Sequence, residues 1–196
     1  MDKPQAARDI ITAALPHVPF DGWTMRALNK GAVDAGYSKT DVIRVFPGGA
    51  MQALDTFLAL SDKAMEAALA QYHLDSMKIR ERITLAVRLR IELHEGHPEA
   101  LRRAVSVLML PPYLPRAMKS IYRTVDSIWH AIGDKSTDFN FYSKRATLAA
   151  VYLATLHFWM NDHSAGHQAS WAFLDRRIED VMKIEKFKYN LFKKIA

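Results

Sequence analysis

The sequence predicts an all-α fold. Alternation of apolar and polar residues, the pattern typical of strands, is nowhere sustained along the chain, and Pro and Gly fall between runs with helical periodicity. The chain has 196 residues, enough for one domain with a substantial core. Its 49% hydrophobic and 24% charged residues are typical of a globular protein. We therefore expect about ten helices packed around apolar side chains.

Three short helices are predicted at the N-terminus. Pro16 and Pro19 end the first of them, and Gly36 is a typical stop for the second. Ser38 and Asp41 have the spacing of a capping box, which begins the third. The expected ranges are 4–15, 24–35 and 38–46, followed by a turn at 47–49.

Longer helices are predicted for the rest of the chain, separated by Gly and Pro. Pro98 suits the first turn of a helix, and Asp138 is a good N-cap. The expected ranges are 50–71, 77–94, 98–110, 115–132, 138–160, 168–182 and a final tail helix over 183–196. No internal repeat, low-complexity tract or interdomain linker separates these segments.

An unusual stripe opens the most apolar of these helices. Asp138, Phe141, Tyr142 and Arg145 are spaced i, i+3, i+4 and i+7, which places them along one face. Core stripes are normally aliphatic, whereas aromatic residues and Arg are favoured at the centres of protein interfaces. The stripe is either a half-exposed stack of Arg on aromatic rings or a docking surface for a partner.

Three segments carry a family resemblance. Residues 129–134 (WHAIGD) lead into residues 138–146 (DFNFYSKRA), and residues 171–182 read WAFLDRRIEDVM. The chain resembles the lipid-binding accessory proteins of ubiquinone (coenzyme Q) biosynthesis, the ninth numbered family of the eukaryotic coenzyme Q set. The resemblance covers most of the chain and is densest over its last seventy or so residues.

This resemblance implies a function and a partner. It implies a non-enzymatic protein that holds an isoprenoid or quinone intermediate at the membrane and presents it to the di-iron demethoxyubiquinone hydroxylase. The partner-binding residues would be Asp138, Phe141, Tyr142 and Arg145. Tryptophan is usual in the family at position 141, so Phe141 keeps the aromatic bulk but lacks an indole N–H donor.

The C-terminal tail has the pattern of an amphipathic helix. Residues 183–196 hold five lysines against Glu185, a net charge of +4 within a chain of formal charge +6. A lysine-rich polar face opposite an apolar face is typical of an interfacial membrane anchor, although such a helix can also pack on its own body or on a partner. Relatives use it at membranes, so membrane-binding residues are expected at Ile184, Phe187, Lys188, Leu191, Phe192, Lys193, Lys194 and Ile195.

The body between the head and the tail is rich in large apolar residues. Sequence alone does not separate a packed core from a cavity, and a core is the commoner outcome. The family resemblance implies a lipid cavity, for which the candidate residues are Met109, Leu110, Tyr113, Trp129, Tyr152, Leu156 and Trp159. A bound lipid or quinone is expected there, and no other cofactor.

The N-terminal head resembles the helix-turn-helix of TetR-type regulators. Residues 1–50 hold six basic and five acidic residues, a net charge of +1, which is poorly suited to neutralising phosphates. Residues 1–182 are thus expected to form a TetR-like domain, with the head at 1–49 and the ligand-binding body at 50–182, followed by the membrane-binding helix 183–196. A TetR-like regulator with an apolar effector is the alternative function, and TetR-like proteins commonly form homodimers through their last helices.

No catalytic or metal-binding motif is visible in the sequence. The chain has no Cys, P-loop, dinucleotide fingerprint, nucleophile elbow or zinc-protease motif. His163 and His167, and His94 and His97, lack a third ligand at a helical spacing. We also see no secretory leader or segment long enough to span a bilayer. The chain is therefore expected not to be an enzyme. We expect it in the cytoplasm of a bacterium, associated peripherally with the inner membrane. Eukaryotic relatives would lie on the matrix side of the mitochondrial inner membrane.

Overall fold

The computed structural model describes the backbone of residues 1–134 and 139–195 and the side chains of residues 1–134 and 141–183. In this part of the chain every regular element is helical: ten α-helices and three short 3-10 helices. The predicted all-α fold is therefore confirmed. The chain divides into two compact units, Met1–Ala67 with Glu92–Thr124, and Ala68–Ile91 with Val125–Ala196.

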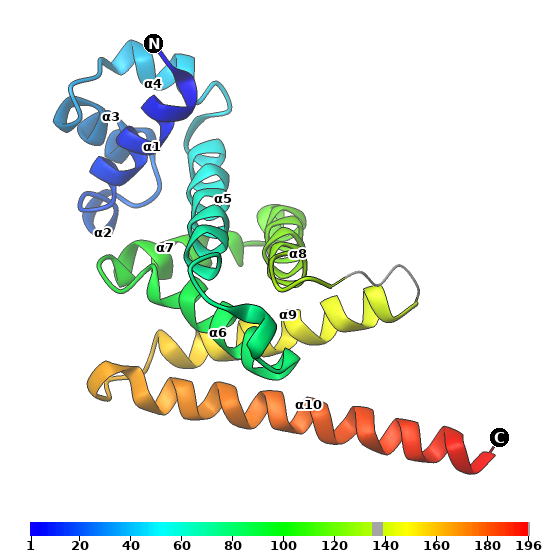
Figure 1. The fold of residues 1–196 in the computed structure, drawn as a ribbon. Helices are drawn as coiled ribbons and strands as arrows, with labels where there is room; N and C mark the ends of the chain where they lie inside the picture. Colours follow the sequence, from blue (N-terminus) through cyan, green and yellow to red (C-terminus); the bar gives the residue numbers. More distant parts are fainter. Residues whose placement is uncertain (135–138, 196) are drawn as a thin grey trace. The chain divides into compact units, whose positions relative to one another are not determined.

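The first unit contains the N-terminal head and the helices that support it (Figure 1). Helix α1 packs closely on α3, where a Cβ added to Gly31 would lie 2.5 Å from the backbone nitrogen of Ala14. Trp23 lies in the same core and donates a hydrogen bond from Nε1 to the carbonyl of Ala100. The helices of this unit are α1 (Lys3–Ala14), α2 (Val18–Asp21), α3 (Met25–Asp34), α4 (Lys39–Val45), α5 (Gly49–Leu69), α7 (Pro98–Leu108) and the first part of α8 (Leu114–Ala131).

Two local predictions in the head have different outcomes. The capping box of α4 is confirmed, since the Asp41 backbone N–H donates to the Ser38 hydroxyl and the Ser38 backbone N–H donates to the Asp41 carboxylate. The short helix α2 was not predicted, because Pro19 suggested a break. Pro19 occupies the second position of α2, where its missing N–H has no helical partner to lose.

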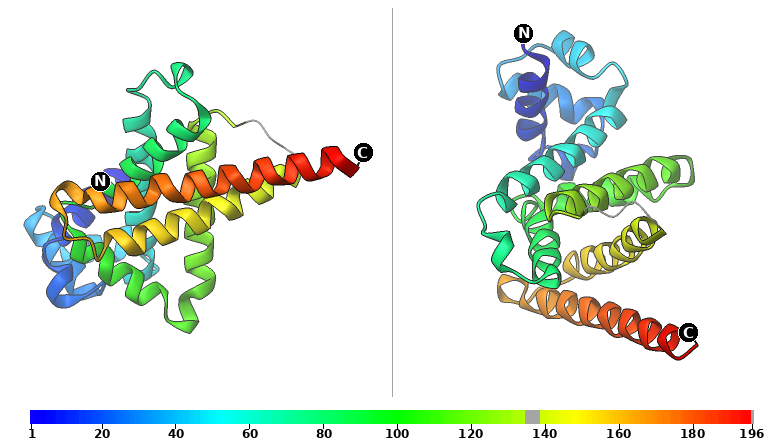
Figure 2. Two further views of the ribbon diagram at one scale, coloured as in Figure 1. Left: turned by 90° about the horizontal axis from the view of Figure 1, so that it is seen from below. Right: turned by 45° about the vertical axis from the view of Figure 1, so that its right-hand side comes forward.

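The second unit is built around an antiparallel pair formed by α9 (Phe139–Trp159) and α10 (Gln168–Ile195). The two helices lie side by side, and the last turns of α10 run past the start of α9 (Figure 2). The unit also contains the second part of α8, α6 (Ile79–Glu92) and the 3-10 helices Leu74–Ser76 and Ala165–His167. A third 3-10 helix, Pro111–Tyr113, lies in the first unit.

Helix α10 is longer than the sequence predicted. The expected boundary at Met182 is absent, and one helix covers both the predicted ninth helix and the tail. The reason is local, because no Gly or Pro lies between Gln168 and Ile195 to end the helix. None of the described helices is long and apolar enough to cross a bilayer.

The turn between α9 and α10 is held by one carboxylate. Asp162 accepts hydrogen bonds from the backbone N–H of Ser164 at 2.8 Å and from the backbone N–H and hydroxyl of Ser170 at 2.9 and 2.6 Å. Gly166 in this turn has φ of 58°, which suits glycine. Asp162 therefore fixes how α10 returns along α9.

We predict that Asp162→Asn lowers the melting temperature at neutral pH. The hydrogen bonds from Ser170 lower the pKa of the Asp162 carboxyl well below its usual range, so folding favours the ionised form. Its stabilisation is complete above the pKa of an unfolded aspartate, about 4, and is lost as pH falls toward the lowered value in the folded chain. The melting temperatures of the variant and the original chain should therefore approach each other as the pH falls, which thermal melts between pH 2 and 7 measure.

Asp180→Asn is the matched control, because the Asp180 side chain is about half exposed (47%) and, among the described side chains, pairs at the surface with Arg177 and Lys183. We expect it to change the melting temperature little at any pH. Equal melting temperatures for the Asp162→Asn variant and the original chain at pH 7 would contradict the role of this turn.

Candidate ligand pocket and docking surface

The end of α8 is shaped by a glycine turn. Gly133 has φ of 88°, and its N–H donates to the carbonyl of His130 while the N–H of Asp134 donates to the carbonyl of Trp129. This pair of bonds forms a Schellman cap, which needs a left-handed residue and so favours glycine. The cap holds Asp134 close to the last turn of α8.

Two cations from α9 meet the carboxylates near the end of α8. Lys144 pairs with Asp134 at 2.8 Å and lies over the ring of Trp129, 5.3 Å from its centroid. Arg145 pairs with Asp126 at 2.7 Å and with Asp134 at 3.7 Å. Arg145 is only 6% exposed, so its charge depends on these partners.

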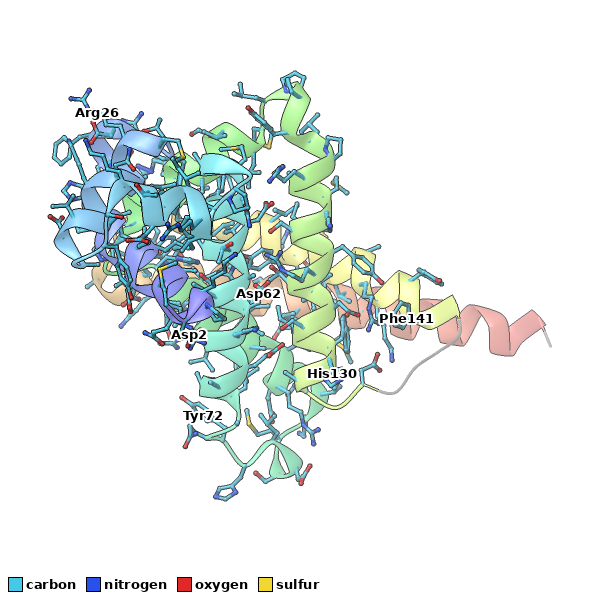
Figure 3. The ribbon with its side chains drawn as sticks, turned by 90° about the horizontal axis from the view of Figure 1, so that it is seen from above. Asp2, Arg26, Asp62, Tyr72, His130 and Phe141 are labelled. Carbon is cyan, nitrogen blue, oxygen red and sulfur yellow. The ribbon has the colours of Figure 1, made fainter. Side chains whose placement is uncertain are left out.

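The predicted stripe at the start of α9 contains a stacked pair. The guanidinium carbon of Arg145 lies 3.3 Å from the centroid of the Phe141 ring, and Arg145 also donates to the Phe141 carbonyl. Tyr142 contacts the Phe141 ring edge-on but is 67% exposed. Figure 3 shows Phe141 at the start of α9. The fourth predicted residue, Asp138, lies outside the described residues.

These contacts divide the stripe by role. The Arg–aromatic stack is present, and Arg145 is a buried support for it. Tyr142 is the described side chain of the stripe that a partner could reach most easily. A docking surface here would therefore rest on Phe141 and Tyr142, with Arg145 fixing their position.

A pocket of about 340 Å³ lies beside this network, within the second unit. One wall comes from α10, another from α9, and the ends of α6 and α8 complete it. Asp134 and Lys144 give one part of the lining an ion pair, and the rest is mainly apolar. The apolar and mixed lining residues are Ile79, Ile83, Trp129, Ser143, Thr147, Leu148, Val151, Ile178, Val181 and Met182.

Arg82 helps to position the pocket. Its guanidinium donates to the carbonyl of Ile132 at 3.2 Å and to the carbonyl of Met77 at 3.0 Å. It thereby joins the start of α6 to the C-terminal end of α8, where a cation also complements the helix dipole.

The predicted lipid-binding residues fall in different places. Trp129 lines the pocket, is 7% exposed, and has a buried indole Nε1 with no hydrogen-bond partner among the described residues. Tyr152, Leu156 and Trp159 are buried in the same unit but do not line this pocket. In the first unit, Met109 and Leu110 are exposed and Tyr113 is half-buried.

Sequence reasoning missed most of the pocket walls. Lys144, Thr147, Leu148 and Val151 are spaced i, i+3, i+4 and i+7 on α9, a signal that could have placed them on one face. The contributions of α6 and α10 depend on tertiary packing and left no comparable local pattern.

The predicted membrane anchor lies on the last part of α10. The backbone of this segment is helical. The side chains assigned to membrane binding lie outside the described residues: Ile184, Phe187, Lys188, Leu191, Phe192, Lys193, Lys194 and Ile195. Their assignment stays a prediction.

The histidines flagged in the sequence lie in separate surroundings. The buried His94 ring lies 5.3 Å from Phe57, and the His167 ring lies 5.0 Å from Trp159. No group of three His, Cys, Asp or Glu side chains in the described part of the chain is arranged to hold a metal ion.

Acidic neighbours offset several cations of the head. Asp21 pairs with Lys30 at 2.5 Å and with Arg26 at 3.4 Å, and these contacts, Lys30 first, lower the pKa of the Asp21 carboxyl. Arg44 on α4 lies 3.6 Å from Asp41. This local pairing adds to the low net charge of the head.

Comparison with known proteins finds similarity to one family. Residues 114–185 match the family model described as COQ9. The human "Ubiquinone biosynthesis protein COQ9, mitochondrial" is 33% identical over 92% of this chain and 58% of the human protein. The rat protein of the same name is 33% identical over 92% of this chain and 60% of its own length. The chain thus spans about three-fifths of the length of these relatives.

A solved structure shows the same fold. The TetR transcriptional regulator from Nitrosomonas europaea superposes with a TM-score of 0.70, covering 88% of this chain and 95% of that one. Its sequence is only 18% identical, so the likeness concerns the fold alone. The predicted TetR-like architecture is confirmed.

We predict that Arg145→Ala destabilises the chain, whereas Tyr142→Ala does not. Removing the guanidinium leaves the buried carboxylate of Asp134 with less compensation and should cost about 3 kcal/mol. Tyr142 is exposed, so its truncation should change the free energy of unfolding by less than about 0.5 kcal/mol. Urea unfolding measures both, and equal effects would show that Arg145 does not support the stripe.

Proposed function

Because this chain is related to the COQ9 proteins over nine-tenths of its length, we propose that it is a non-enzymatic, lipid-binding accessory protein of ubiquinone biosynthesis. It binds a quinone or isoprenoid intermediate at the membrane and presents it to the di-iron demethoxyubiquinone hydroxylase. In a bacterium it would act in the cytoplasm, at the inner membrane. The observation that carries this proposal is the mainly apolar pocket beside the stripe at the start of α9.

The lining of the pocket suits an amphiphile with a polar ring and an apolar tail. Ile79, Ile83 and Val181 offer apolar surface, while Lys144 can donate a hydrogen bond to a ring oxygen. The indole N–H of Trp129 is a second potential donor, since it has no acceptor among the described residues. A carbonyl or phenolic oxygen is the group that these donors would recognise.

The size of the pocket indicates partial enclosure. A volume of about 340 Å³ is at the small end of the range for ligand pockets. It accommodates a substituted ring and the first part of a chain, and a long isoprenoid tail would extend beyond it. Each exposed CH₂ of such a tail costs about 0.8 kcal/mol in water, so the remainder favours the bilayer.

The position of the stripe supports presentation to an enzyme. Lys144 lines the pocket, and its neighbour Arg145 stacks on Phe141 at the proposed docking surface. A hydroxylase bound to Phe141 and Tyr142 would therefore meet the chain within one helical turn of the pocket lining. Asp138 belongs to the same proposed surface from the sequence.

Helix α10 offers a connection between the pocket and the membrane. Ile178, Val181 and Met182 line the pocket, and the same helix continues into the predicted anchor. Lysines on that segment would add on the order of 1 kcal/mol each at an anionic surface. Membrane docking by this tail would hold the chain where its ligand resides.

A homodimer is part of the proposal. Leu153 on α9 is exposed, and Phe158 stacks on Phe173 of α10 with ring centroids 4.7 Å apart. Apolar groups on the outer side of the last two helices suit pairing with a second copy. The TetR-like fold supports the same arrangement.

The alternative of a transcriptional regulator is weaker. Its head would have to neutralise several phosphates. Arg26 and Lys30 share Asp21, and Arg44 lies beside Asp41. We propose that the head serves as scaffold, and that the chain requires no cofactor besides its lipid ligand.

We predict that Thr147→Trp reduces the amount of bound lipid. Thr147 lines the pocket, and an indole ring would occupy space that the ligand needs. The full chain, purified from a ubiquinone-producing host, would be extracted with organic solvent and its lipids quantified by mass spectrometry. We expect at least about tenfold less quinone-type lipid per chain, equivalent to about 1.4 kcal/mol of lost binding.

Ile43→Trp is the control, because Ile43 is exposed on α4 in the other unit. Its lipid content should equal that of the original chain, and thermal melts confirm that both variants fold. Equal lipid content in both variants, or no isoprenoid lipid in the original chain, would overturn the proposed ligand site.

We predict that Tyr142→Glu weakens binding to the demethoxyubiquinone hydroxylase of the same organism. The substitution replaces an exposed aromatic side chain of the proposed surface with a carboxylate, and the cost of desolvating this charge would oppose docking. Titration calorimetry with the purified hydroxylase should give a Kd at least about tenfold higher, the effect of a typical interface aromatic. Tyr72→Glu, at an exposed tyrosine in the segment before α6, should leave the Kd unchanged, and equal Kd values for the two variants would remove Tyr142 from the docking surface.

A further inference from the structure

A stripe of exposed apolar side chains lies at the start of α8, in the first unit. Met109 and Leu110 precede the helix, and Leu114, Met118 and Tyr122 follow on it at intervals of four residues. Met118 is 64% exposed. We call these five residues the α8 apolar stripe. Monomeric proteins rarely leave a contiguous apolar surface uncovered, so the stripe indicates an interaction site.

The opposite face of α8 packs on α5. Thr124 and Arg123 both donate hydrogen bonds to Asp62 of α5, at 2.8 Å each. Arg116 pairs with Asp55 of the same helix. At 100° per residue these three side chains lie away from Leu114, Met118 and Tyr122. The α8 apolar stripe therefore faces away from α5, and its exposure is set by the packing of the helix.

A positive charge lies at the edge of the stripe. Residues 100–125 contain five basic residues and no Asp or Glu, and four of the five pair with acids from outside this segment: Arg102 and Arg103 with Glu99, Arg116 with Asp55 and Arg123 with Asp62. Lys119 is exposed at the edge of the stripe, whereas Arg116 and Arg123 lie on the opposite face, where they pair with α5. Asp55 and Asp62 come from α5, behind the helix. The outward surface thus combines apolar groups with positive charge.

We propose that the α8 apolar stripe is a second membrane contact, which enters the interface of a bilayer that contains anionic lipids. Leu114 and Met118 would lie among the acyl chains near the headgroups, and Tyr122 suits the interface because its ring is amphipathic. Lys119 would meet anionic headgroups. The proposal adds to the proposed function, on which it rests, a contact separate from the α10 tail.

A membrane fits this surface better than a protein does. A second copy docked by twofold symmetry would place both Lys119 ammonium groups in one interface, where like charges oppose association. Protein interfaces also carry about one hydrogen bond per 100–200 Å². The stripe and the exposed Pro111, Pro112 and Pro115 beside it offer few donors, whereas a lipid surface demands no fixed partners. The flexible side chain of Met118 also suits a fluid surface.

Site-specific fluorescence tests the proposal on the full chain. The chain has no Cys, so Met118→Cys gives one labelling site for an environment-sensitive dye such as NBD. Vesicles of phosphatidylcholine with phosphatidylglycerol should raise the emission at least about threefold and shift it to the blue, as expected for transfer from water to an apolar region. Ile43→Cys, at another exposed apolar position, is the matched control and should not respond.

A third label, Leu191→Cys on the tail, separates this proposal from the proposed function. A response at Leu191 but not at Met118 overturns the second contact and leaves the membrane role of the tail intact. Silence at both positions overturns both. A response at Met118 that depends on protein concentration without vesicles assigns the stripe to a second copy and also overturns the proposal.

Polar substitution gives an independent measurement. Changing Leu114, Met118 and Tyr122 together to Ser should lower partitioning of the full chain onto these vesicles by roughly tenfold, because three exposed apolar groups no longer enter the interface. Val33 and Ile43, both exposed on the head, changed together to Ser should leave it unchanged. Equal partitioning of the two variants would contradict the proposal.

Discussion

The burial of one guanidinium governs the second unit. Arg145 lies almost fully inside the protein, where an unpaired charge would be strongly destabilising. Asp126 and Asp134 compensate it from the end of α8, and the carbonyl and ring of Phe141 compensate it from α9. The cap at Gly133 places Asp134 for this task. The junction of α8 and α9 therefore contains a buried ion-pair network, and the loss of one partner would leave a buried charge uncompensated.

This junction gives the pocket and the proposed docking surface a common support. Asp134 pairs with Lys144, which lines the pocket, and with Arg145, which supports Phe141. A ligand oxygen that attracts Lys144 would weaken its pair with Asp134 and leave that carboxylate to Arg145. Ligand binding and partner binding can thus influence each other through one shared acid, and any such coupling must act equally in both directions.

The sequence was informative where structure is local. Helix ends followed from Gly, Pro and capping residues, as the capping box of Ser38 and the stop at Gly36 illustrate. The spacing of Phe141 and Arg145 correctly placed them in contact. The burial of Arg145 could not be predicted from the local sequence, because its partner Asp126 lies nineteen residues earlier on another helix.

The pocket lining could not be predicted from local sequence either. Ile79 and Ile178 lie far apart in sequence and meet only through tertiary packing. Met109 and Leu110 were assigned to a lipid pocket from the family resemblance and their apolar side chains, whereas they lie exposed in the first unit. An apolar side chain has the same composition in a core, a cavity or a surface stripe, so only its surroundings distinguish these roles.

Two modest membrane contacts would suit a carrier better than one strong anchor. If both contacts reach the same bilayer, the second would form at a high effective concentration once the tail has bound, and the two together would hold the chain more tightly than either alone. Each weak contact would still release on its own, which would keep binding reversible. A pocket that encloses only part of the proposed ligand would require reversible binding at the membrane, because the uncovered tail of the lipid would stay in the bilayer while the ring is held in the protein. Residence at the interface is thus a condition for presenting such a ligand at all.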